Sequence, residues 1–301
     1  MDLQQLEYFV RVADQRSFSN AAVLLDVSQP TLSRAVRALE VELKTTLFRR
    51  NGRGVQPTPA GRRFLDHARG VLRGADAARE AVREGHSRQA GRVALGLPQS
   101  LAQVVVPPFT EAFLKRFPQA SLSIVQGLSD GLSDQVAAGR LDFAVIRNPA
   151  PSSLLTIELI GNEELFLLGA RKFSRGGKPV RLEDLQRVPL IMPNAPNVTR
   201  PLIEAALARR GLALHVNLEV DSVPSLIELV AKGLGYSIIP ATTCLVVPSG
   251  RGLHAERIDA PELRLSLCLV SPARPSQTRL VAEAARDIRE RVAKALAPRP
   301  T

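Results

Sequence analysis

Residues 27–37 have the sequence Val-Ser-Gln-Pro-Thr-Leu-Ser-Arg-Ala-Val-Arg, which predicts a helix that begins just after a serine. Ser28 is a favourable N-cap, because its hydroxyl can accept a hydrogen bond from a free N–H of the first turn. Pro30 falls within that turn, where its missing N–H removes no hydrogen bond. One face of the helix is predicted to be buried, because apolar residues recur at helical spacing at Leu32, Val36 and Leu39.

The residues before this helix predict a shorter helix and a tight turn, and together they make a helix-turn-helix. Residues 19–25 carry small side chains where another helix must pack closely, and Asp26 and Val27 form the turn. An opening helix over residues 3–13 is expected to act as a scaffold. Its inward side chains are predicted to be Leu3, Leu6, Phe9, Val10 and Ala13.

The exposed face of the predicted second helix carries basic and hydrogen-bonding side chains near its N-terminus. The major groove of double-stranded DNA accepts a helix of this kind, whose side chains then reach the base edges. We therefore expect DNA contacts from the starts of both helices and from this face, at Ser17, Ser28, Gln29, Pro30, Thr31, Ser33, Arg34 and Arg37.

An irregular stretch follows at residues 47–57, where two glycines and an Asn-Gly pair predict a hairpin turn. Such a hairpin would be the wing of a winged helix-turn-helix. Arginines on a wing can follow phosphates or enter a narrow minor groove. We expect Arg53 in the minor groove and Arg49 and Arg50 on phosphates. The alternative is that Arg49 or Arg50 forms a salt bridge to a helix.

Thr58 and Pro59 predict the cap and the first residue of a long helix that runs to residue 84. Side chains spaced alternately by three and four residues form a seam typical of a coiled coil: Leu65, Ala68, Leu72, Ala75, Arg79 and Val82. Arg79 is the one residue of this seam that is not apolar. The helix over 59–84 either joins two copies of the chain as a homodimer or packs on its own domain. Residues 85–91 break the helix and predict a linker.

Composition and charge favour a polyanionic partner. The chain of 301 residues has a formal net charge of +11, and residues 29–69 hold nine arginines and lysines against three acidic residues. No apolar run approaches the ~20 residues that span a membrane, and the first five residues have no signal-peptide pattern. We therefore expect a cytoplasmic protein without a membrane partner.

The cysteines and histidines predict neither a disulfide framework nor a metal site. Cys244 and Cys268 both lie in apolar stretches, which predicts a structural role for them. The four histidines are scattered and show no metal-ligand spacing. We expect no metal and no cofactor.

These motifs together resemble the LysR-type transcriptional regulators. Besides residues 27–37, the resemblance rests on Leu-Glu-Tyr-Phe at 6–9, Ser-Phe-Ser-Asn-Ala-Ala at 17–22, Leu-Phe-Arg-Arg at 47–50 and Thr-Pro-Ala-Gly at 58–61. It implies that the long helix joins a dimer, that two dimers form a homotetramer, and that the target is an interrupted near-palindrome. Gly-Leu-Pro-Gln-Ser at 96–100 looks closest to members that control nitrogen assimilation.

From residue 92 onward, short apolar runs alternate with helical patterns, which predicts parallel sheets covered by helices. Strands are expected at 92–97, 121–126, 143–147, 164–169, 190–192, 215–220, 236–239 and 265–270. Gly-Arg-Leu-Asp-Phe-Ala-Val-Ile at 139–146 and Gly-Leu-Gly-Tyr at 233–236 resemble the effector-binding domain of the same family. That domain is similar to periplasmic solute-binding proteins.

We thus expect an α/β fold with an all-α N-terminal part. A winged helix-turn-helix over 1–58 and a dimerisation and linker helix over 59–90 precede a two-lobed effector-binding domain over 91–301. The chain is expected to cross between the lobes near residues 160–163 and 265–268. Lobe 1 would then comprise 91–161 and 267–301, and lobe 2 would comprise 162–266.

Ligands of open α/β sheets lie beyond the carboxyl ends of the strands, where helix N-termini offer free N–H groups. Polar residues that follow the predicted strands are therefore candidates: Gln99, Ser100, Ser129, Arg147, Asn148, Asn194, Asn197 and Thr199. The family's effector residues lie in matching loops, so the resemblance favours Ser100, Ser129, Arg147 and Thr199. Hydroxyls beside the cation of Arg147 suit a small carboxylate or another anion. The alternative is that each residue is an ordinary cap or turn residue.

Two other functions stay open. Gly-Leu-Ser-Asp-Gly at 127–131 matches the G-x-S-x-G pattern of serine esterases, and Asp221 and His254 would complete a triad. No glycine-rich oxyanion segment precedes the pattern, and a hydrolase has no use for a DNA-binding unit, so we expect no enzyme. A DNA-binding regulator without an effector would keep the N-terminal unit but would not need two lobes.

Overall fold

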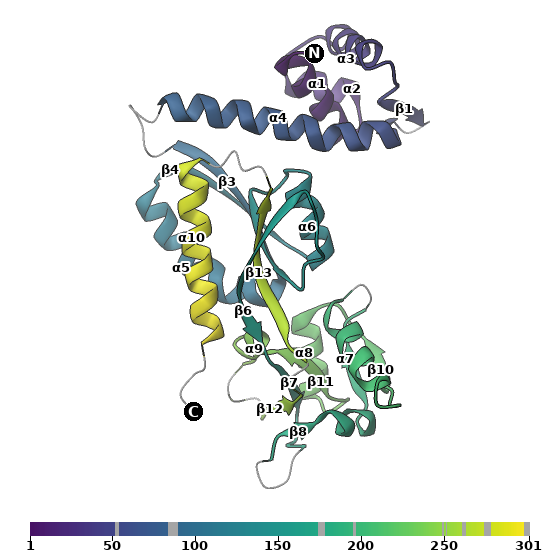
Figure 1. Cartoon of the computed structure of the whole chain (residues 1–301), viewed down its shortest axis with the longest axis vertical. Coiled ribbons are helices and arrows are strands. Elements are labelled where there is room, and N and C mark those ends of the chain that lie inside the picture. The colour runs from purple at the N-terminus through teal and green to yellow at the C-terminus, as the bar shows by residue number, and fades with distance from the viewer. Residues whose placement is uncertain are drawn as a thin grey trace.

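The computed structural model describes the chain except for residues 52–53, 84–89, 174–177, 195–196, 249, 251, 261–262, 274–277 and 298–301. Figure 1 shows a small helical unit with a hairpin, a long helix beneath it, and two α/β lobes. The last helix returns to the first lobe, where it lies beside α5.

Three helices form the helical unit: α1 (Leu3–Gln15), α2 (Phe18–Leu24) and α3 (Gln29–Glu42). A side chain caps the N-terminus of each, and the cap residues are Asp2, Ser17 and Ser28. At the turn between α2 and α3, Asp26 adopts the left-handed conformation with a φ of 52°. The predicted helix-turn-helix is therefore confirmed, including Ser28 as the cap of its second helix.

The core of this unit forms where α1 packs on α3 and on the long helix. Leu32, Val36 and Leu39 are buried, as the spacing predicts. Leu3 is exposed, so its predicted inward position is wrong. The reason is that neighbouring helices cover α1 only from Leu6 onward.

The predicted hairpin is confirmed: β1 (Phe48–Asn51) and β2 (Gly54–Pro57) pair antiparallel. The N–H of Val55 donates to the carbonyl oxygen of Arg16, at the end of α1, over 3.0 Å. Gly54 has a φ of 140°, and a Cβ there would lie 2.6 Å from the same oxygen. These contacts fix the wing relative to α1.

The long helix α4 spans Pro59–Arg83 and begins as predicted. The Thr58 hydroxyl accepts the N–H of Gly61 at 2.9 Å and donates to the carbonyl of Thr46 at 2.8 Å. A Cβ on Gly61 would lie 2.1 Å from the carbonyl oxygen of Leu47. The first turn of α4 therefore presses directly on the segment that leads into the wing.

The first half of the predicted coiled-coil seam is used within the chain. Ala68 is buried, and Leu65 and Leu72 pack partly buried against the side chains of α1. Arg69 beside them forms an ion pair with Asp14 of α1. The assignment of these three apolar residues to a dimer seam is therefore wrong, because the helical unit already covers them.

The outward side of α4 keeps small and apolar side chains. Val71 is 47% exposed, Ala75 is half-buried and Ala78 is exposed. The side chain of Val82 and residues 84–89 of the predicted linker lie outside the described part of the chain.

Lobe 1 contains a five-stranded mixed sheet in the order β4-β3-β5-β13-β6. Its strands are β3 (Ala90–Leu97), β4 (Gln119–Gln126), β5 (Phe143–Arg147), β6 (Leu155–Glu163) and β13 (Leu265–Pro272). β3 pairs parallel with β4 and β5, but β13 pairs antiparallel with β5 and β6. The prediction of an all-parallel sheet is wrong here, because β13 enters this sheet on its return from lobe 2.

Helices cover both faces of this sheet: α5 (Gln99–Arg116) and α10 (Arg279–Leu296) on one face, and α6 (Ser129–Ala137) on the other. Alternate residues of β5 show this division. Val145 packs with the side chains of α5 and α10, whereas Ala144 and Ile146 pack with those of α6.

Lobe 2 contains a four-stranded sheet in the order β11-β7-β12-β8, beside a parallel pair of β9 and β10. Its strands are β7 (Leu165–Gly169), β8 (Val180–Arg181), β9 (Leu190–Met192), β10 (Val216–Glu219), β11 (Ser237–Pro240) and β12 (His254–Asp259). Its helices are α7 (Thr199–Ala208), α8 (Val223–Ala231), α9 (Ala241–Cys244) and the 3-10 helix η1 (Leu182–Arg187). β7 pairs antiparallel with β11 and β12, again against the prediction.

The chain crosses between the lobes along two paired strands. Glu163 at the end of β6 lies opposite Leu265 at the start of β13. Leu265 packs in the core of lobe 2, whereas Leu267 packs in the core of lobe 1. Among the described helices, none is both long enough and apolar enough to cross a membrane.

Candidate DNA-binding surface and effector cleft

The start of α3 presents a rigid polar turn to solvent. The Ser28 hydroxyl accepts the N–H of Thr31 at 3.2 Å and lies 2.7 Å from the hydroxyl of Thr31. Gln29 and Pro30 are exposed, as predicted for residues that meet DNA. Ser17 is half-buried at the cap of α2, where its hydroxyl accepts a backbone N–H at 3.2 Å.

Arg34 and Arg37 lie further along the same exposed face. The Nε of Arg34 donates to the carbonyl of Pro30 at 3.3 Å, which aligns the side chain along the helix. Neither arginine forms an ion pair with a described residue, so both charges stay available to phosphates or bases. Ser33 is half-buried and presents less of its side chain than predicted.

The wing adds a further exposed cation. Arg49 is exposed and has no ion-pair partner within the described ranges. The side chain of Arg50 and the whole of Arg53 lie outside the described residues.

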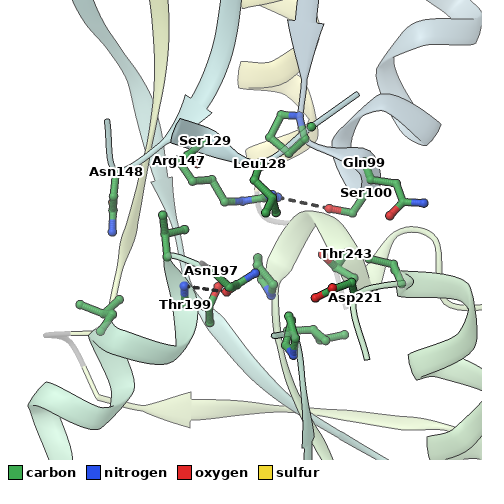
Figure 2. A pocket seen from close by; sticks show the side chains of 18 of the residues that line it. Gln99, Ser100, Leu128, Ser129, Arg147, Asn148, Asn197, Thr199, Asp221 and Thr243 are labelled. Carbon is green, nitrogen blue, oxygen red and sulfur yellow. Dashed lines mark hydrogen bonds between the residues drawn. The ribbon is translucent and has the colours of Figure 1, made fainter. Parts of the chain in front are cut away.

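A cavity of about 1140 Å³ lies between the two lobes (Figure 2). Lobe 1 contributes the ends of β3, β4 and β5 and the starts of α5 and α6, and lobe 2 contributes β11 and the starts of α7 and α8. Of the eight predicted effector residues, the following line it: Gln99, Ser100, Ser129, Arg147, Asn148 and Thr199. Asn197 lines it as well.

Two helices that begin at the cavity, α5 and α6, have no side-chain cap, whereas at α7 the Thr199 N–H donates to Oδ1 of Asn197 over 2.9 Å. The N-cap residues of α5 and α6 are Pro98 and Leu128, and neither accepts a backbone hydrogen bond through its side chain. By contrast, α8 beside them is capped by Ser222. Uncapped helix N-termini carry free N–H groups and a partial positive charge, and they therefore favour an anionic group in the cavity.

The hydroxyls of two buried residues face the cavity from opposite lobes. Ser129, the first residue of α6, is 9% exposed, and Thr199, the first residue of α7, is 5% exposed. Neither hydroxyl has a hydrogen-bond partner in the part of the chain that the structure describes. Both hydroxyls are open to the cavity, so each can donate a hydrogen bond to a ligand there.

Arg147 does not offer a free cation. Its Nε donates to Oε2 of Glu163 at 2.6 Å, and its Nη2 donates to the hydroxyl of Thr242 at 2.8 Å and approaches the Ser100 hydroxyl at 3.4 Å. The Thr242 hydroxyl in turn donates to Oε1 of Glu163 at 2.5 Å. The prediction of an available cation is therefore wrong, because buried Glu163 already compensates the guanidinium.

Of the predicted asparagines Asn148 and Asn194, only Asn148 lines the cavity. Asn148 lines the cavity at a φ of 45°, and its Oδ1 accepts the N–H and hydroxyl of Ser266 at 2.7 and 2.9 Å, which leaves Nδ2 as a free donor. Asn194 is not a lining residue. Its N–H and Nδ2 donate to the two carboxylate oxygens of Asp221 at 2.8 and 2.9 Å, and Asp221 itself lines the cavity.

Sequence reasoning missed Asp130, Glu163 and Thr242 as parts of this site. Asp221 entered only as a member of a triad, although it follows a strand as the other candidates do. Glu163 ends a strand that was not predicted, and Thr242 belongs to a four-residue helix without a periodic pattern. Only the three-dimensional fold brings these side chains to Arg147.

The esterase triad is not assembled. Ser129 and Asp221 both line the cavity, but His254 opens β12 and is not a lining residue. Among the residues that the structure describes, no histidine lines the cavity, so Ser129 lacks a general base.

Both cysteines are free and protected. Burial raises the pKa of the Cys244 thiol to about 12, and burial also raises the pKa of Cys268. Thiols of this kind are poor nucleophiles, which supports a structural role.

Two family profiles match the chain. Residues 3–62 match "Bacterial regulatory helix-turn-helix protein, lysR family", and residues 86–293 match "LysR substrate binding domain". The chain belongs to the LysR family. It is a DNA-binding transcriptional regulator with an effector-binding domain, not an enzyme, as the resemblance implies.

Relatives and solved structures agree with this assignment. The chain is 30% identical over 277 residues to the nitrogen assimilation regulatory protein Nac of Klebsiella aerogenes, which covers 92% of this chain and 90% of Nac. It is 29% identical over 275 residues to the transcriptional dual regulator GltC of Bacillus subtilis, and the match covers 90% of this chain and 91% of GltC. The predicted resemblance to a regulator of nitrogen assimilation is thus confirmed.

Among solved structures, a full-length cysteine variant of OxyR from Pseudomonas aeruginosa has a TM-score of 0.80 at 25% identity, covering 96% of this chain and 95% of that one. Full-length CbnR in complex with its target DNA has a TM-score of 0.63 at 24% identity, and the match covers 97% of this chain and 100% of CbnR. The likeness to CbnR shows a shared fold.

Proposed function

We propose that this LysR-family regulator is controlled by a small molecule bound in the cleft between its lobes. The observation that carries the proposal is a pair of hydroxyls, on Ser129 and Thr199, which face one cavity from opposite lobes and have no hydrogen-bond partner among the described residues. A ligand that bonds to both favours the closed arrangement of the lobes. It shifts the equilibrium only by its difference in affinity for the open and closed states.

The effector of this proposal carries an anionic group, such as a carboxylate. The free N–H groups at the starts of α5 and α6 support this assignment, in place of the compensated guanidinium of Arg147. The contact residues we propose are Gln99, Ser100, Ser129, Asn148, Asn197 and Thr199, whereas Arg147 and Asn194 position their neighbours.

We assign DNA recognition to residues 1–58, with base contacts from α3 and phosphate contacts from the helix starts and the wing. The proposed contacts are Ser17, Ser28, Gln29, Pro30, Thr31, Ser33, Arg34, Arg37, Arg49, Arg50 and Arg53. The exposure and free charges of Arg34, Arg37 and Arg49 support this assignment. Residues 59–90 connect this unit to the effector domain at 91–301, and the regulator acts on cytoplasmic DNA.

We further propose a homodimer through the outward side of α4, and a homotetramer of two such dimers. Val71, Ala75 and Ala78 support this interface, because they are spaced on one side of the helix and stay exposed or half-buried in the single chain. In the tetramer, closure of the lobes would change the angle between the two DNA-binding pairs and so the bend of the promoter.

The dimer is tested by Val71→Glu, which places a charge in the proposed interface. We expect sedimentation to show dissociation of the α4 dimer, together with loss of binding to two half-sites. The matched control is Val41→Glu, since Val41 is 68% exposed on α3 and lies outside the interface. Equal assembly of both variants would contradict the proposed interface.

Footprinting on the upstream intergenic DNA across a salt series tests DNA recognition. We expect protection of an interrupted near-palindrome, with affinity that falls steeply as salt rises. Arg49→Ala is expected to reduce the salt slope by about one unit, because it removes one phosphate contact. An unchanged slope would show that Arg49 does not touch a phosphate.

A further inference from the structure

We propose that the cleft selects a zwitterion, an α-amino acid, whose carboxylate meets the open start of α6 and the Thr199 hydroxyl and whose ammonium meets Asp221. The inference rests on the proposed effector function of the cleft and specifies the chemical class of the ligand. Three features of the cavity carry it: its charge, the orientation of Asp221 and the placement of its donors.

The charged side chains that line the cavity do not favour a ligand that is only anionic. They are Asp130, Arg147 and Asp221. The charge of Arg147 is compensated by Glu163, whereas the solvent-exposed side chains of Asp130 and Asp221 have no ion-pair partner among the described residues. A dianion would therefore place a second negative charge near uncompensated carboxylates, and a ligand with a cationic group avoids that repulsion.

Asp221 is held in a fixed orientation and keeps unused acceptor capacity. Asn194 donates one hydrogen bond to each of its carboxylate oxygens, at 2.8 and 2.9 Å. An ionised carboxylate accepts about four hydrogen bonds, so each oxygen keeps a free lone pair. An ammonium group supplies three hydrogen-bond donors and a positive charge, so it can bond to the free lone pairs of the Asp221 carboxylate and compensate its negative charge.

One group of donors in the cavity lies apart from Asp221. Figure 2 shows Asn148, Asn197 and Thr199 toward one side of the view, and Asp221 with Gln99, Ser100 and Thr243 toward the other. Nδ2 of Asn148, the hydroxyl of Thr199 and the first-turn N–H groups of α6 are donors that suit a carboxylate. A molecule with a carboxylate at the first group and an ammonium at Asp221 pairs with both sides.

The rest of the ligand has room against an apolar wall. The cavity measures about 1140 Å³, and lobe 2 lines it with the apolar side chains of Leu202, Val223, Leu226 and Ile238. Such a wall accommodates an uncharged side chain. The favoured ligand is therefore an amino acid whose own side chain carries no charge.

The test compares matched ligands on the full-length chain. The panel contains the uncharged L-amino acids, the 2-oxo acid of each, which keeps the carboxylate but lacks the ammonium, and the amine of each, which lacks the carboxylate. Thermal shift identifies binders and calorimetry measures their affinity. We expect at least one amino acid to bind about tenfold or more tightly than its 2-oxo acid and its amine, because a charge-assisted hydrogen bond is lost in each.

Asp221→Asn sharpens the comparison. We expect it to lower the affinity for the amino acid about tenfold or more and to leave the affinity for the 2-oxo acid unchanged or higher. The matched control is Asp134→Asn, because Asp134 is exposed on α6 and does not line the cavity. The comparison of ligands uses the unaltered chain, so the test does not depend on the folding of a variant.

The zwitterion inference is overturned if the 2-oxo acid binds as tightly as the amino acid, or if no amino acid binds at millimolar concentration. It is also overturned if folded Asp221→Asn keeps full affinity for the amino acid. The proposed function survives these outcomes when the DNA footprint still changes with the low-molecular-weight fraction of a cell extract. Loss of that response as well would contradict the proposed function itself.

Discussion

The DNA-binding surface and the effector cleft use the same residue type in opposite ways. Arg34 on α3 is exposed and has no acidic partner among the described residues, so its charge can meet a phosphate or a base. Arg147 in the cleft is 8% exposed, and Glu163 compensates its charge at 2.6 Å. A cation at the surface needs no partner, whereas a buried one does, so burial decides whether an arginine recognises a ligand or organises the site.

The largest effect is expected when the buried pair is broken. Glu163→Gln should lower the free energy of unfolding by about 3–5 kcal/mol, because it leaves the guanidinium of Arg147 buried without a compensating charge. Urea denaturation followed by circular dichroism measures this loss. The control is Glu158→Gln, whose ion pair with Arg289 is exposed and should contribute below ~1 kcal/mol. Equal losses in both variants would refute the distinction between buried and exposed pairs.

A smaller effect is expected at the start of α4, which supports the DNA-binding unit. Gly61→Ala should destabilise the chain by about 1–3 kcal/mol, because the new Cβ would meet the carbonyl oxygen of Leu47. Gly74→Ala is the matched control on the same helix: no atom lies within 4 Å of its added Cβ, so it should stabilise by about 0.5–1 kcal/mol. Thermal melts of both variants check the opposite signs, and the same sign in both would contradict the close contact.

Removal of the exposed arginine Arg34 should weaken the recognition of specific DNA and leave the stability of the fold unchanged. Arg34→Ala is expected to reduce the preference for the target over a scrambled sequence by about 1–3 kcal/mol, with an unchanged melting temperature. Competition binding measures the preference. Arg187→Ala, which removes an exposed arginine from lobe 2, serves as the control. If Arg34→Ala weakened target and scrambled DNA equally, its contact would be to a phosphate.

The smallest effect is expected at the thiols. Because burial raises the pKa of Cys244 to about 12, from an ordinary value of 9.0, the folded chain keeps a neutral thiol at pH 8. Hydrogen peroxide should therefore leave the mass of the peptide that contains Cys244 and the affinity of the protein for DNA unchanged. The unfolded thiol ionises first, so this group's contribution to stability falls as the pH rises above 9.0. A sulfenic acid on Cys244 after mild oxidation would contradict the protection.

The same comparison explains which parts were predictable from sequence. The helix-turn-helix depends on local features, such as the cap at Ser28 and the spacing of Leu32 and Val36, and these lie within a few residues of one another. Likewise, β9 was predicted with its observed bounds, Leu190–Met192, because a short buried strand is a continuous apolar run.

The parts that failed depend on contacts between distant residues. The direction of β13 follows from the return of the chain out of lobe 2, which no local pattern records. Glu163 and Thr242 meet Arg147 although they are 79 residues apart in the chain. In the long helix, a seam that faces α1 has the same spacing as one that faces a second copy, so Leu65 and Ala68 were assigned to the wrong partner.

The division of labour between the two regions is the central claim, and one measurement tests it most directly. Footprinting on the upstream intergenic DNA would compare the wild type, Arg34→Ala and Ser129→Trp, with and without the low-molecular-weight fraction of a cell extract. Ser129→Trp fills the cleft, so we expect wild-type protection that no longer responds to the extract, whereas Arg34→Ala loses protection in both conditions. Equal loss of protection in both variants, or an undiminished response in Ser129→Trp, would contradict the account.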